Sequence, residues 1–215
     1  YGNGLYRYDG IHFQQFTKKD GLVSNYIRVL LYSKKFHCLI AGAEYGVNTI
    51  KGSTITSSPS EMFTTKVGRT VTGLCEAGIF IYITTYGDNN PVKYYPDQNK
   101  FIVSNDNGKH YPQNSFSCYV SANGDTIFSN KANGIKIFKK NKQIIQNDNL
   151  GQIFSCAEDK RGNLWIAAWS YQNMNQSGGL FRFDGERFQN FKTTFGISDR
   201  EIWTVSYDRE QDILW

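Results

Sequence analysis

Short runs of alternating hydrophobic and polar residues extend along the chain, and no stretch keeps a sustained helical period. Alternation with a period of two places successive side chains on opposite faces of a β-strand. These runs, of which YIRVLLYS at 26–33 is one, are separated by turn sequences such as SANG and DKRG. The pattern therefore predicts an all-β chain built from short strands.

One hydrophobic phrase recurs at a nearly constant interval. Its anchor residues are Ile40, Ile83, Phe128 and Ile166, which lie 43, 45 and 38 residues apart. Each interval also holds one strand before the anchor and a hairpin after it, so that it contains four strands. Four antiparallel strands in an interval of this length are typical of a β-propeller blade. We therefore expect the four anchor side chains to be buried at equivalent places in successive blades.

The expected strands form three sets. First strands are expected at 26–33, 70–77, 115–122, 152–159 and 201–208. Second strands, which carry the anchors, are expected at 37–42, 80–85, 125–130, 163–169 and 212–215. Outer hairpins of third and fourth strands are expected at 4–16, 46–56, 91–103, 134–145 and 179–191.

These sets define about five repeats of four-stranded antiparallel blades. The repeats run approximately over 1–42, 43–85, 86–130, 131–169 and 170–215, and the first and last are incomplete. We expect 1–215 to be a single β-propeller region that is a fragment of a larger propeller. Closure of a ring by the two ends, which are complementary in phase, is the alternative.

The hairpins at the two ends of the chain have nearly the same sequence. GLYRYDGIHFQQF at 4–16 and GLFRFDGERFQNF at 179–191 are identical at eight of thirteen positions. In each, Asp-Gly separates two aromatic-rich runs, which predicts a two-residue turn because Gly tolerates a positive φ. A lone hairpin is barely stable in water and must pack on similar elements. We interpret the pair as equivalent outer strands, four blades apart.

Composition supports strands and argues against several classes of function. Aromatic residues make up 15% of the chain, which favours β-structure. The net charge of +5 comes from scattered Lys and Arg, so we expect a solvated surface and no nucleic-acid partner. The longest apolar run, IFIYI at 79–83, is far too short to span a bilayer. Contact with a membrane is expected only through segments outside this sequence.

The four cysteines lack the spacing of a metal site. They show neither CxxC nor CxH, and the three histidines occupy unrelated blade positions, so no metal and no cofactor are predicted. Cys118 and Cys156 stand in the same phrase, Phe-Ser-Cys, and we expect both to be buried thiols that are not bonded to each other. A disulfide is the alternative, since an even number of cysteines in an exported protein permits one.

Several segments resemble the two-component regulator-propeller repeat. The best examples are DKRGNLWIAAW at 159–169, GLFRFDGERFQNF at 179–191 and KDGLVSNYIRVL at 19–30. In the same order, they are similar to the family's Asp-x-x-Gly-Asn-Leu-Trp-Ile, Gly-Leu-x-Arg-Phe-Asp-Gly and Gly-Leu-x-x-Asn-x-Ile elements. Residues 43–130 lack the Trp and most of the motif. The resemblance implies the periplasmic sensor region of a bacterial hybrid two-component receptor, followed by a histidine kinase and dimeric in full length. It also implies that the region senses a carbohydrate breakdown product without catalysis.

Candidate ligand-binding residues lie where the repeat is broken. Loops from second to third strands, and loops that lead into the next first strand, should project on one face of a propeller. Aromatic faces with amide and Arg donors on that face suit an oligosaccharide, whose C–H faces stack while its hydroxyls need hydrogen bonds. The insertion WSYQNMNQSGG at 169–179 is the strongest such break. The candidates are Tyr45, Tyr86, Lys131, Trp169, Tyr171, Asn173, Arg69 and Arg200.

Two other functions compete with ligand sensing. A polysaccharide-active propeller enzyme, either a hydrolase or a lyase, would need a carboxyl pair near the axis, and Glu44 and Asp88 are expected on the same face of adjacent blades. A protein-interaction propeller is the third possibility. No Gly-x-Ser-x-Gly elbow is present, and no catalytic residue is predicted.

Overall fold

A computed structural model of the chain describes residues 2–63, 69–86, 90–104, 115–130, 134–139, 142–170, 177–191, 197 and 201–215. Within this part of the chain the regular elements are β-strands and one short 3-10 helix, η1 (Lys18–Asp20), and no α-helix is present. The chain divides into two compact units, an N-terminal unit of residues 1–106 and a C-terminal unit of residues 107–215. The all-β prediction is confirmed.

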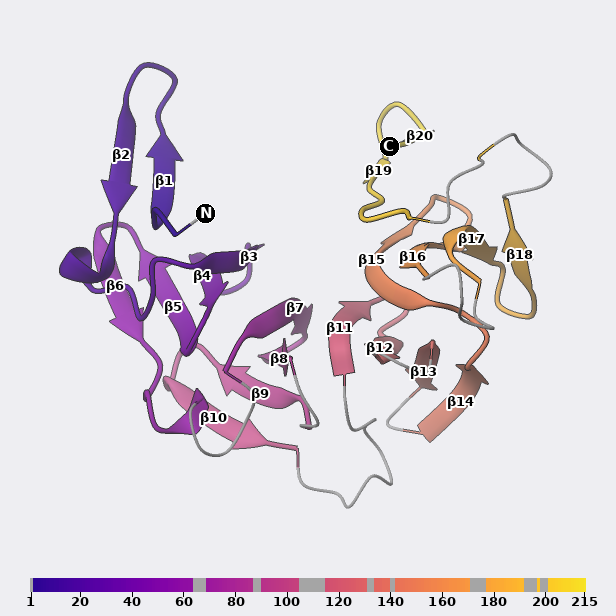
Figure 1. The fold of residues 1–215 in the computed structure, drawn as a ribbon, viewed down its shortest axis with the longest axis horizontal. Coiled ribbons are helices and arrows are strands. Elements are labelled where there is room, and N and C mark those ends of the chain that lie inside the picture. The colour runs from indigo at the N-terminus through magenta and orange to yellow at the C-terminus, as the bar shows by residue number, and fades with distance from the viewer. Residues whose placement is uncertain are drawn as a thin grey trace. The chain divides into compact units, whose positions relative to one another are not determined.

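The N-terminal unit holds two four-stranded antiparallel sheets and one hairpin (Figure 1). The first sheet is β3 (Ile27–Ser33), β4 (Cys38–Ala43), β5 (Gly46–Lys51) and β6 (Thr54–Ser57). The second sheet is β7 (Val71–Ala77), β8 (Phe80–Thr85), β9 (Val92–Tyr95) and β10 (Lys100–Val103). The hairpin is β1 (Leu5–Tyr8) and β2 (Phe13–Phe16).

The C-terminal unit repeats the same plan (Figure 1). Its first sheet is β11 (Ser115–Val120), β12 (Thr126–Asn130), β13 (Ile135–Lys139) and β14 (Lys142–Asn147). Its second sheet is β15 (Gln152–Glu158), β16 (Leu164–Trp169), β17 (Gly179–Phe183) and β18 (Phe188–Asn190). A short hairpin, β19 (Tyr207–Asp208) and β20 (Ile213–Leu214), follows. In all four sheets the strands pair in chain order, which confirms the predicted propeller blades.

Three of the four anchors, Ile40, Ile83 and Ile166, belong to apolar clusters between two sheets. Ile40, Ile83, Phe128 and Ile166 are each 0% exposed, so their predicted burial is confirmed. The predicted equivalence holds for the last three and is wrong for Ile40, because the residue at the corresponding register position of the first sheet is Ala41. In the N-terminal unit, residues of β4 and β5 share one apolar cluster with residues of β7, β8 and β9, so the two sheets pack face to face. In the C-terminal unit, residues of β12 and β13 share a cluster with β15, β16 and β17 in the same way. Each blade therefore buries its apolar face against its neighbour.

A glutamate carboxylate also joins the two sheets of each unit. Ser33 of β3 donates its hydroxyl hydrogen to Oε2 of Glu76 in β7, at 2.5 Å. In the C-terminal unit the backbone N–H of Ala122 donates to Oε2 of Glu158 in β15, at 2.6 Å. Glu76 and Glu158 hold equivalent positions, because each lies two residues after the partner of an anchor, Ile83 or Ile166. The two units thus use a carboxylate at the same position, with a serine hydroxyl as its donor in one and a backbone N–H in the other.

The two similar hairpins have the same register. Arg7 pairs with Gln14 in β1–β2, and Arg182 pairs with Gln189 in β17–β18. In both hairpins the aromatic pair that flanks the turn is stacked, with ring centroids 4.5 Å apart and an interplanar angle of 24°. The predicted equivalence of these hairpins is confirmed in their internal geometry. Their surroundings differ, because β17 pairs with β16 on its other edge, whereas β1 pairs only with β2 among the described strands.

The predicted role of Asp-Gly at the tip of these hairpins is correct for Gly and wrong for Asp. Gly10 has φ 103° and Gly185 has φ 101°, the positive values expected. Asp9 is not a central residue of the turn, since its N–H donates to the carbonyl of His12. Its carboxylate instead accepts from the N–H groups of Ile11 and His12, at 2.9 and 2.7 Å. The Asp therefore holds the turn closed through its side chain.

Two further expectations need correction. All four cysteines are thiols, as expected, but Cys118 and Cys156 are half-buried rather than buried, since they lie on first strands at the edge of their sheets. Burial of the sulfur, with a smaller effect of Cys118, raises the pKa of the Cys156 thiol to about 12. The first strand predicted at 201–208 is reduced to β19 at its end. The backbone before it forms an isolated β-bridge between Glu201 and Trp169.

The DKRGNLW phrase is a side-chain network around one carboxylate. Asp159 accepts from the N–H groups of Arg161 and Asn163, both at 2.9 Å. It also accepts from Asn163 Nδ2 at 2.8 Å and from Trp165 Nε1 at 2.9 Å. Burial alone would raise the pKa of Asp159, but these donors outweigh it and the pKa lies below the usual range. The hydrogen bonds of Asp159 thus fix the turn between β15 and β16.

We predict that Ile166→Ala destabilises the C-terminal unit by about 2–5 kcal/mol, because it leaves a cavity between two packed sheets. Ile11→Ala, the same change at a side chain that is 80% exposed, should cost less than about 0.5 kcal/mol. Urea unfolding followed by far-ultraviolet circular dichroism, which reports the strands of both units, measures both. Equal costs for the two variants would contradict the assignment of Ile166 as an anchor.

We predict that Asp159→Ala lowers stability at neutral pH by about 1–3 kcal/mol, the typical cost of leaving hydrogen-bond donors without their acceptor. Because folding depresses the pKa of this carboxyl, its contribution is present above the unfolded pKa of about 4 and is lost as pH falls through the folded value. The difference between Asp159→Ala and the unmutated chain should therefore shrink in acid. Asp208→Ala, which removes the acceptor of two backbone hydrogen bonds, from the N–H groups of Glu210 and Gln211, should have the smaller effect. A pH-independent difference would argue against this reading.

Candidate functional site

A β-bulge occurs at the same place in the first strand of every four-stranded sheet. The pairing register shifts between Ile27 and Val29, Val71 and Gly73, Ser115 and Ser117, and Ile153 and Ser155. One residue is therefore left without a partner in each strand, and bulges re-aim such side chains. The bulged residues are Arg28, Thr72, Phe116 and Phe154. Trp203 follows Ile202 as Phe154 follows Ile153, so it occupies the corresponding place before β19.

In the C-terminal unit these positions form a row of contacting aromatic rings. The rings of Phe116 and Phe154 meet edge to face, with centroids 5.4 Å apart. The rings of Phe154 and Trp203 are 4.6 Å apart and tilted by 40°. We call Phe116, Phe154 and Trp203 the aromatic row. Trp169, the last residue of β16, lies beside it, with its ring 6.1 Å from that of Trp203.

Hydrogen bonds hold the strands that carry the row side by side. The Ser117 hydroxyl donates to the carbonyl of Ile153 at 3.1 Å, which links β11 to β15. The Ser155 hydroxyl donates to the carbonyl of Val205 at 3.0 Å, which links β15 to the segment that carries Trp203. Each serine directly follows a bulged aromatic residue. Hydrogen bonds therefore join the three backbone segments that carry the row, β11, β15 and the segment before β19.

Three of the sequence-predicted ligand residues come together in the N-terminal unit. The N–H of Tyr45 donates to the carbonyl of Arg69, and the N–H of Tyr86 donates to the carbonyl of Thr70, at 2.8 Å. Tyr45 is 41% exposed and Tyr86 is 48% exposed, and Arg69 is exposed as well. The structure thus brings the backbone of these three residues together at the start of β7.

Of the other predicted ligand residues, only Trp169 lies within the described part of the chain. Trp169 is half-buried and stands three residues after the anchor Ile166, as Tyr86 stands three residues after Ile83. Lys131, Tyr171, Asn173 and Arg200 lie outside the described residues, as does Asp88 of the proposed carboxyl pair. Glu44, the other member of that pair, forms an ion pair with Arg28, with Oε1 3.2 Å from Nη2.

Sequence reasoning missed Trp203. The sequence did contain a sign of it, because an aromatic residue follows isoleucine in both first-strand phrases, QIFS at 152–155 and EIWT at 201–204. The bulge that turns this residue away from the regular alternation cannot be read from the phrase itself. Without the bulge, Trp203 is indistinguishable from a residue of the sheet core. The structure shows it 56% exposed.

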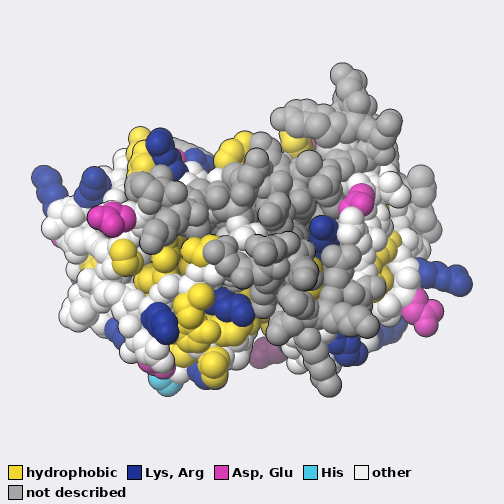
Figure 2. Space-filling view, turned by 90° about the horizontal axis from the view of Figure 1, so that it is seen from below, with side chains coloured by type: hydrophobic (Ala, Val, Ile, Leu, Met, Phe, Trp, Pro, Cys, Tyr) yellow, Lys and Arg dark blue, Asp and Glu magenta, His cyan; other side chains and the backbone are white. Residues whose placement is uncertain are grey.

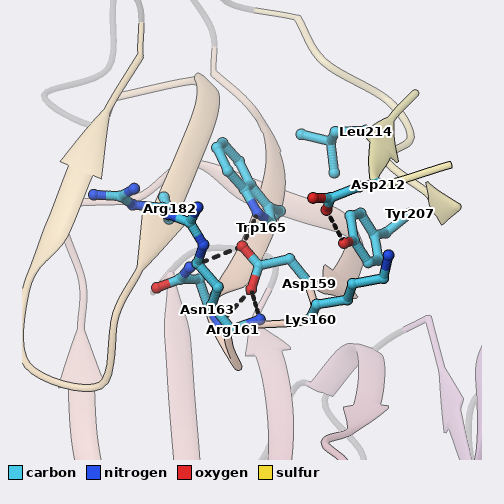
Figure 3. A pocket seen from close by; sticks show the side chains of 9 residues that line it. All are labelled: Asp159, Lys160, Arg161, Asn163, Trp165, Arg182, Tyr207, Asp212 and Leu214. Carbon is cyan, nitrogen blue, oxygen red and sulfur yellow. Dashed lines mark hydrogen bonds between the residues drawn. The ribbon is translucent and has the colours of Figure 1, made fainter. Parts of the chain in front are cut away.

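A polar pocket lies at the opposite end of β16 from Trp169 (Figure 3). Its volume is about 230 Å³, and its polar groups serve the scaffold. Asp159 is surrounded by the donors described above, Arg182 donates to Gln189 Oε1 at 2.9 Å, and the Tyr207 hydroxyl donates to Asp212. The lining residues are Asp159, Lys160, Arg161, Asn163, Trp165, Arg182, Tyr207, Asp212 and Leu214.

A second pocket lies at the corresponding turns of the N-terminal unit. It has a volume of about 310 Å³ and is lined by Lys35, Phe36, Ile79, Tyr95, Asp97 and Gln98. Figure 2 shows hydrophobic side chains gathered on the lower face of this unit, with Lys and Arg beside them. Because both pockets lie between neighbouring sheets at the same type of turn, we interpret them as grooves of the repeat.

The described residues contain neither a metal-binding group nor a membrane-spanning helix. No group of three or more His, Cys, Asp or Glu side chains in this part of the chain is placed to hold a metal ion. No helix in it is long and apolar enough to cross a membrane.

Comparison with known proteins identifies the fold. No family model matches the chain, and no curated protein sequence matches it. Two extracellular domains of hybrid two-component systems from B. thetaiotaomicron match with TM-scores of 0.60 and 0.69, at 16% and 15% identity. They cover 100% and 94% of this chain, which spans only 34% and 31% of theirs. A gluconolactonase from Xanthomonas campestris matches with a TM-score of 0.55 at 14% identity, over 88% of this chain and 69% of its own.

This chain accordingly has the β-propeller fold shared with the extracellular domains of hybrid two-component systems, as the resemblance of its repeats predicted.

Proposed function

We infer that this chain is part of the extracytoplasmic, ligand-sensing propeller of a two-component receptor. The inferred ligand is an oligosaccharide released by polysaccharide breakdown in the periplasm, and the region binds it without catalysis. In the complete receptor, which is proposed to be a dimer, a membrane segment and a histidine kinase would follow. The contact between the indoles of Trp203 and the half-buried Trp169 is the observation that supports this proposal best.

The physical argument rests on what an exposed indole can bind. The Trp203 indole contacts the rings of Phe154 and Trp169, at 4.6 and 6.1 Å between centroids, so these side chains form one flat apolar surface. A sugar ring matches such a surface, because its C–H face is apolar while its edge carries hydroxyls. Tyr45, Arg69 and Tyr86 offer a second group of aromatic and donor side chains in the N-terminal unit.

Non-catalytic binding is favoured over hydrolysis by the side chains around Trp169. The insertion at 169–179 contains no acid and no histidine, so it cannot supply a general acid or base. The carboxylate of Glu44, which the enzyme alternative requires, is already engaged by Arg28. The fold is also found in a gluconolactonase, so the enzyme alternative deserves a direct test.

We predict that an array of neutral and uronate-containing oligosaccharides identifies a sugar that binds the 215-residue chain and is recovered unchanged. Binding is measured by titration calorimetry, and the recovered sugar is analysed by chromatography. Cleavage or ring opening of the bound sugar would favour the enzyme alternative. Absence of binding to every member of the array would count against carbohydrate sensing.

We predict that Trp169→Ala weakens binding of that sugar about tenfold or more, equivalent to about 1.4 kcal/mol. Because Trp169 is only half-buried, the loss of stability should stay below the roughly 3–5 kcal/mol of a fully buried large aromatic residue. Trp215→Ala, the same change at a side chain that is 70% exposed and outside the cluster, should leave affinity unchanged. A large loss of stability with unchanged affinity would make Trp169 a packing residue.

A further inference from the structure

The β5–β6 hairpin faces the neighbouring blade with side chains unlike those of its counterpart in the C-terminal unit. Thr49 of β5 pairs with Ile40, and Ile137 of β13 pairs with Ile127, which takes the place of Ile40 in its own sheet. Thr49 and Ile137 therefore hold equivalent positions. Ile137 belongs to the apolar cluster between two sheets, whereas Thr49 brings a hydroxyl to the same place. The partner of Thr49 in β6 is also a threonine, Thr56.

The strand opposite shows the same difference. Tyr94 of β9 and Phe183 of β17 hold equivalent positions, because each pairs with the residue two places before the anchor of its sheet. Each ring stacks on a phenylalanine of the following strand. The centroids are 4.4 Å apart for Tyr94 and Phe101, and 4.5 Å apart for Phe183 and Phe188. The packing of the two rings is thus alike in both units, and Tyr94 adds a hydroxyl to it.

The hydroxyls of Thr49 and Tyr94 meet across the two blades. They form a hydrogen bond of 2.5 Å, and the Tyr94 hydroxyl also lies 3.5 Å from Asn99 Oδ1. Burial raises the pKa of the Tyr94 phenol, so the hydroxyl keeps its proton at neutral pH. The C-terminal unit has Ile137 and Phe183 in these places, so the packing of two blades accepts an apolar pair here as well.

A groove of about 310 Å³, lined by this hydroxyl pair, lies between the β5–β6 hairpin and the β9–β10 turn. Its first wall is one face of the hairpin. Two register pairs form that face, Thr49 with Thr56 and Lys51 with Thr54. Its second wall is the turn at 96–99. Both walls belong to blades of four described strands that pack on each other, so the groove is a completed interface of the repeat. We call it the threonine groove.

The β9–β10 turn contributes polar groups to the second wall. It runs over residues 95–100 between the stacked rings, whereas the C-terminal unit spans the same place with the shorter stretch 184–187. The longer turn extends to the neighbouring blade, where Asp97 Oδ1 lies 3.6 Å from Lys51 Nζ. Both charged side chains are exposed, so their pairing is weak and opens at little cost.

The lining of the threonine groove matches a neutral ligand that carries several hydroxyls. Its own hydroxyls and the amides of Gln98 and Asn99 include both donors and acceptors, which is what the hydroxyls of a sugar require. Lys51 and Asp97 cancel each other's charge, so the groove gives no net attraction to an ion. Pro96 adds apolar surface for C–H groups. The volume is near the lower end of the roughly 300–1,000 Å³ of ligand sites, which suits one sugar residue rather than a chain.

We propose that the threonine groove binds one neutral sugar residue through hydrogen bonds to the hydroxyls of Thr49, Thr56 and Tyr94. This inference goes beyond the proposed function, because it adds a second site, which lies in the N-terminal unit. The groove shares no residue with the aromatic row or with the ligand residues predicted from the sequence.

The test measures binding of three neutral monosaccharides, glucose, galactose and xylose, to the 215-residue chain by NMR titration. The Thr49→Val/Tyr94→Phe double variant removes both hydroxyls together, so that neither is left buried without its partner. It should weaken binding tenfold or more and unfold at nearly the same urea concentration, since the C-terminal unit has an aliphatic side chain and a phenylalanine in these places. Tyr32→Phe/Thr126→Val makes the same two changes outside the groove and should bind as the unmutated chain does.

A single variant covers the case in which the double variant does not fold. Thr56→Val removes an exposed hydroxyl of the groove and leaves the hydrogen bond between the blades in place. It should also weaken binding, with an unchanged unfolding midpoint. Unchanged affinity in this variant would overturn the proposal.

The outcomes separate the threonine groove from the proposed function. Binding that is lost in the double variant and kept in its control supports the groove. Binding of none of the three monosaccharides overturns it, whatever the oligosaccharide array shows. Binding that Trp169→Ala abolishes and the double variant leaves unchanged would support the proposed function and overturn the groove. A lower unfolding midpoint with unchanged affinity in the double variant would show that the hydroxyl pair only joins the blades. Stronger binding of glucuronate than of glucose would refute a site for neutral sugars.

Discussion

Packing of one four-stranded sheet on the next is the interaction on which this structure depends. A single sheet of four short strands cannot bury its apolar face alone, and each unit solves this by placing two sheets face to face over a shared cluster. The anchors of β4, β8, β12 and β16 lie in the sheets that make these interfaces. The carboxylates of Glu76 and Glu158 add one directional contact to each interface and so fix how the sheets are aligned.

This dependence explains which features could be predicted from the sequence. The anchors and the strands around them repeat because every interface makes the same demand, and repetition is visible without a structure. The equivalence of the two hairpins is visible for the same reason, down to the register of Arg7 and Arg182. The DKRGNLW phrase is also a scaffold element, since the Asp159 carboxylate accepts hydrogen bonds from the turn to which it belongs.

Features that depend on a departure from the repeat were predicted poorly. The bulge before Ser155 is a change of backbone register that leaves no mark in the residues, and so Trp203 was missed. The Asp9 turn was misjudged because Asp-Gly fits a central turn position as well as the observed side-chain cap. Cys156 was expected to be buried because alternation gives the face of a strand but not its place at a sheet edge. Half of the predicted ligand residues lie outside the described residues, so their convergence stays a prediction.

The hairpin β1–β2 differs from its counterpart in what surrounds it. In β17, Phe181 and Phe183 are buried beside β16, whereas Tyr6 and Tyr8 of β1 are 50% and 57% exposed and Phe13 of β2 is 72% exposed. A strand whose backbone groups face outward beside aromatic side chains can template the addition of another strand. Two hairpins of nearly the same sequence thus differ in how far water reaches their aromatic rings, and the strand beside the hairpin, not the hairpin itself, decides which rings are shielded.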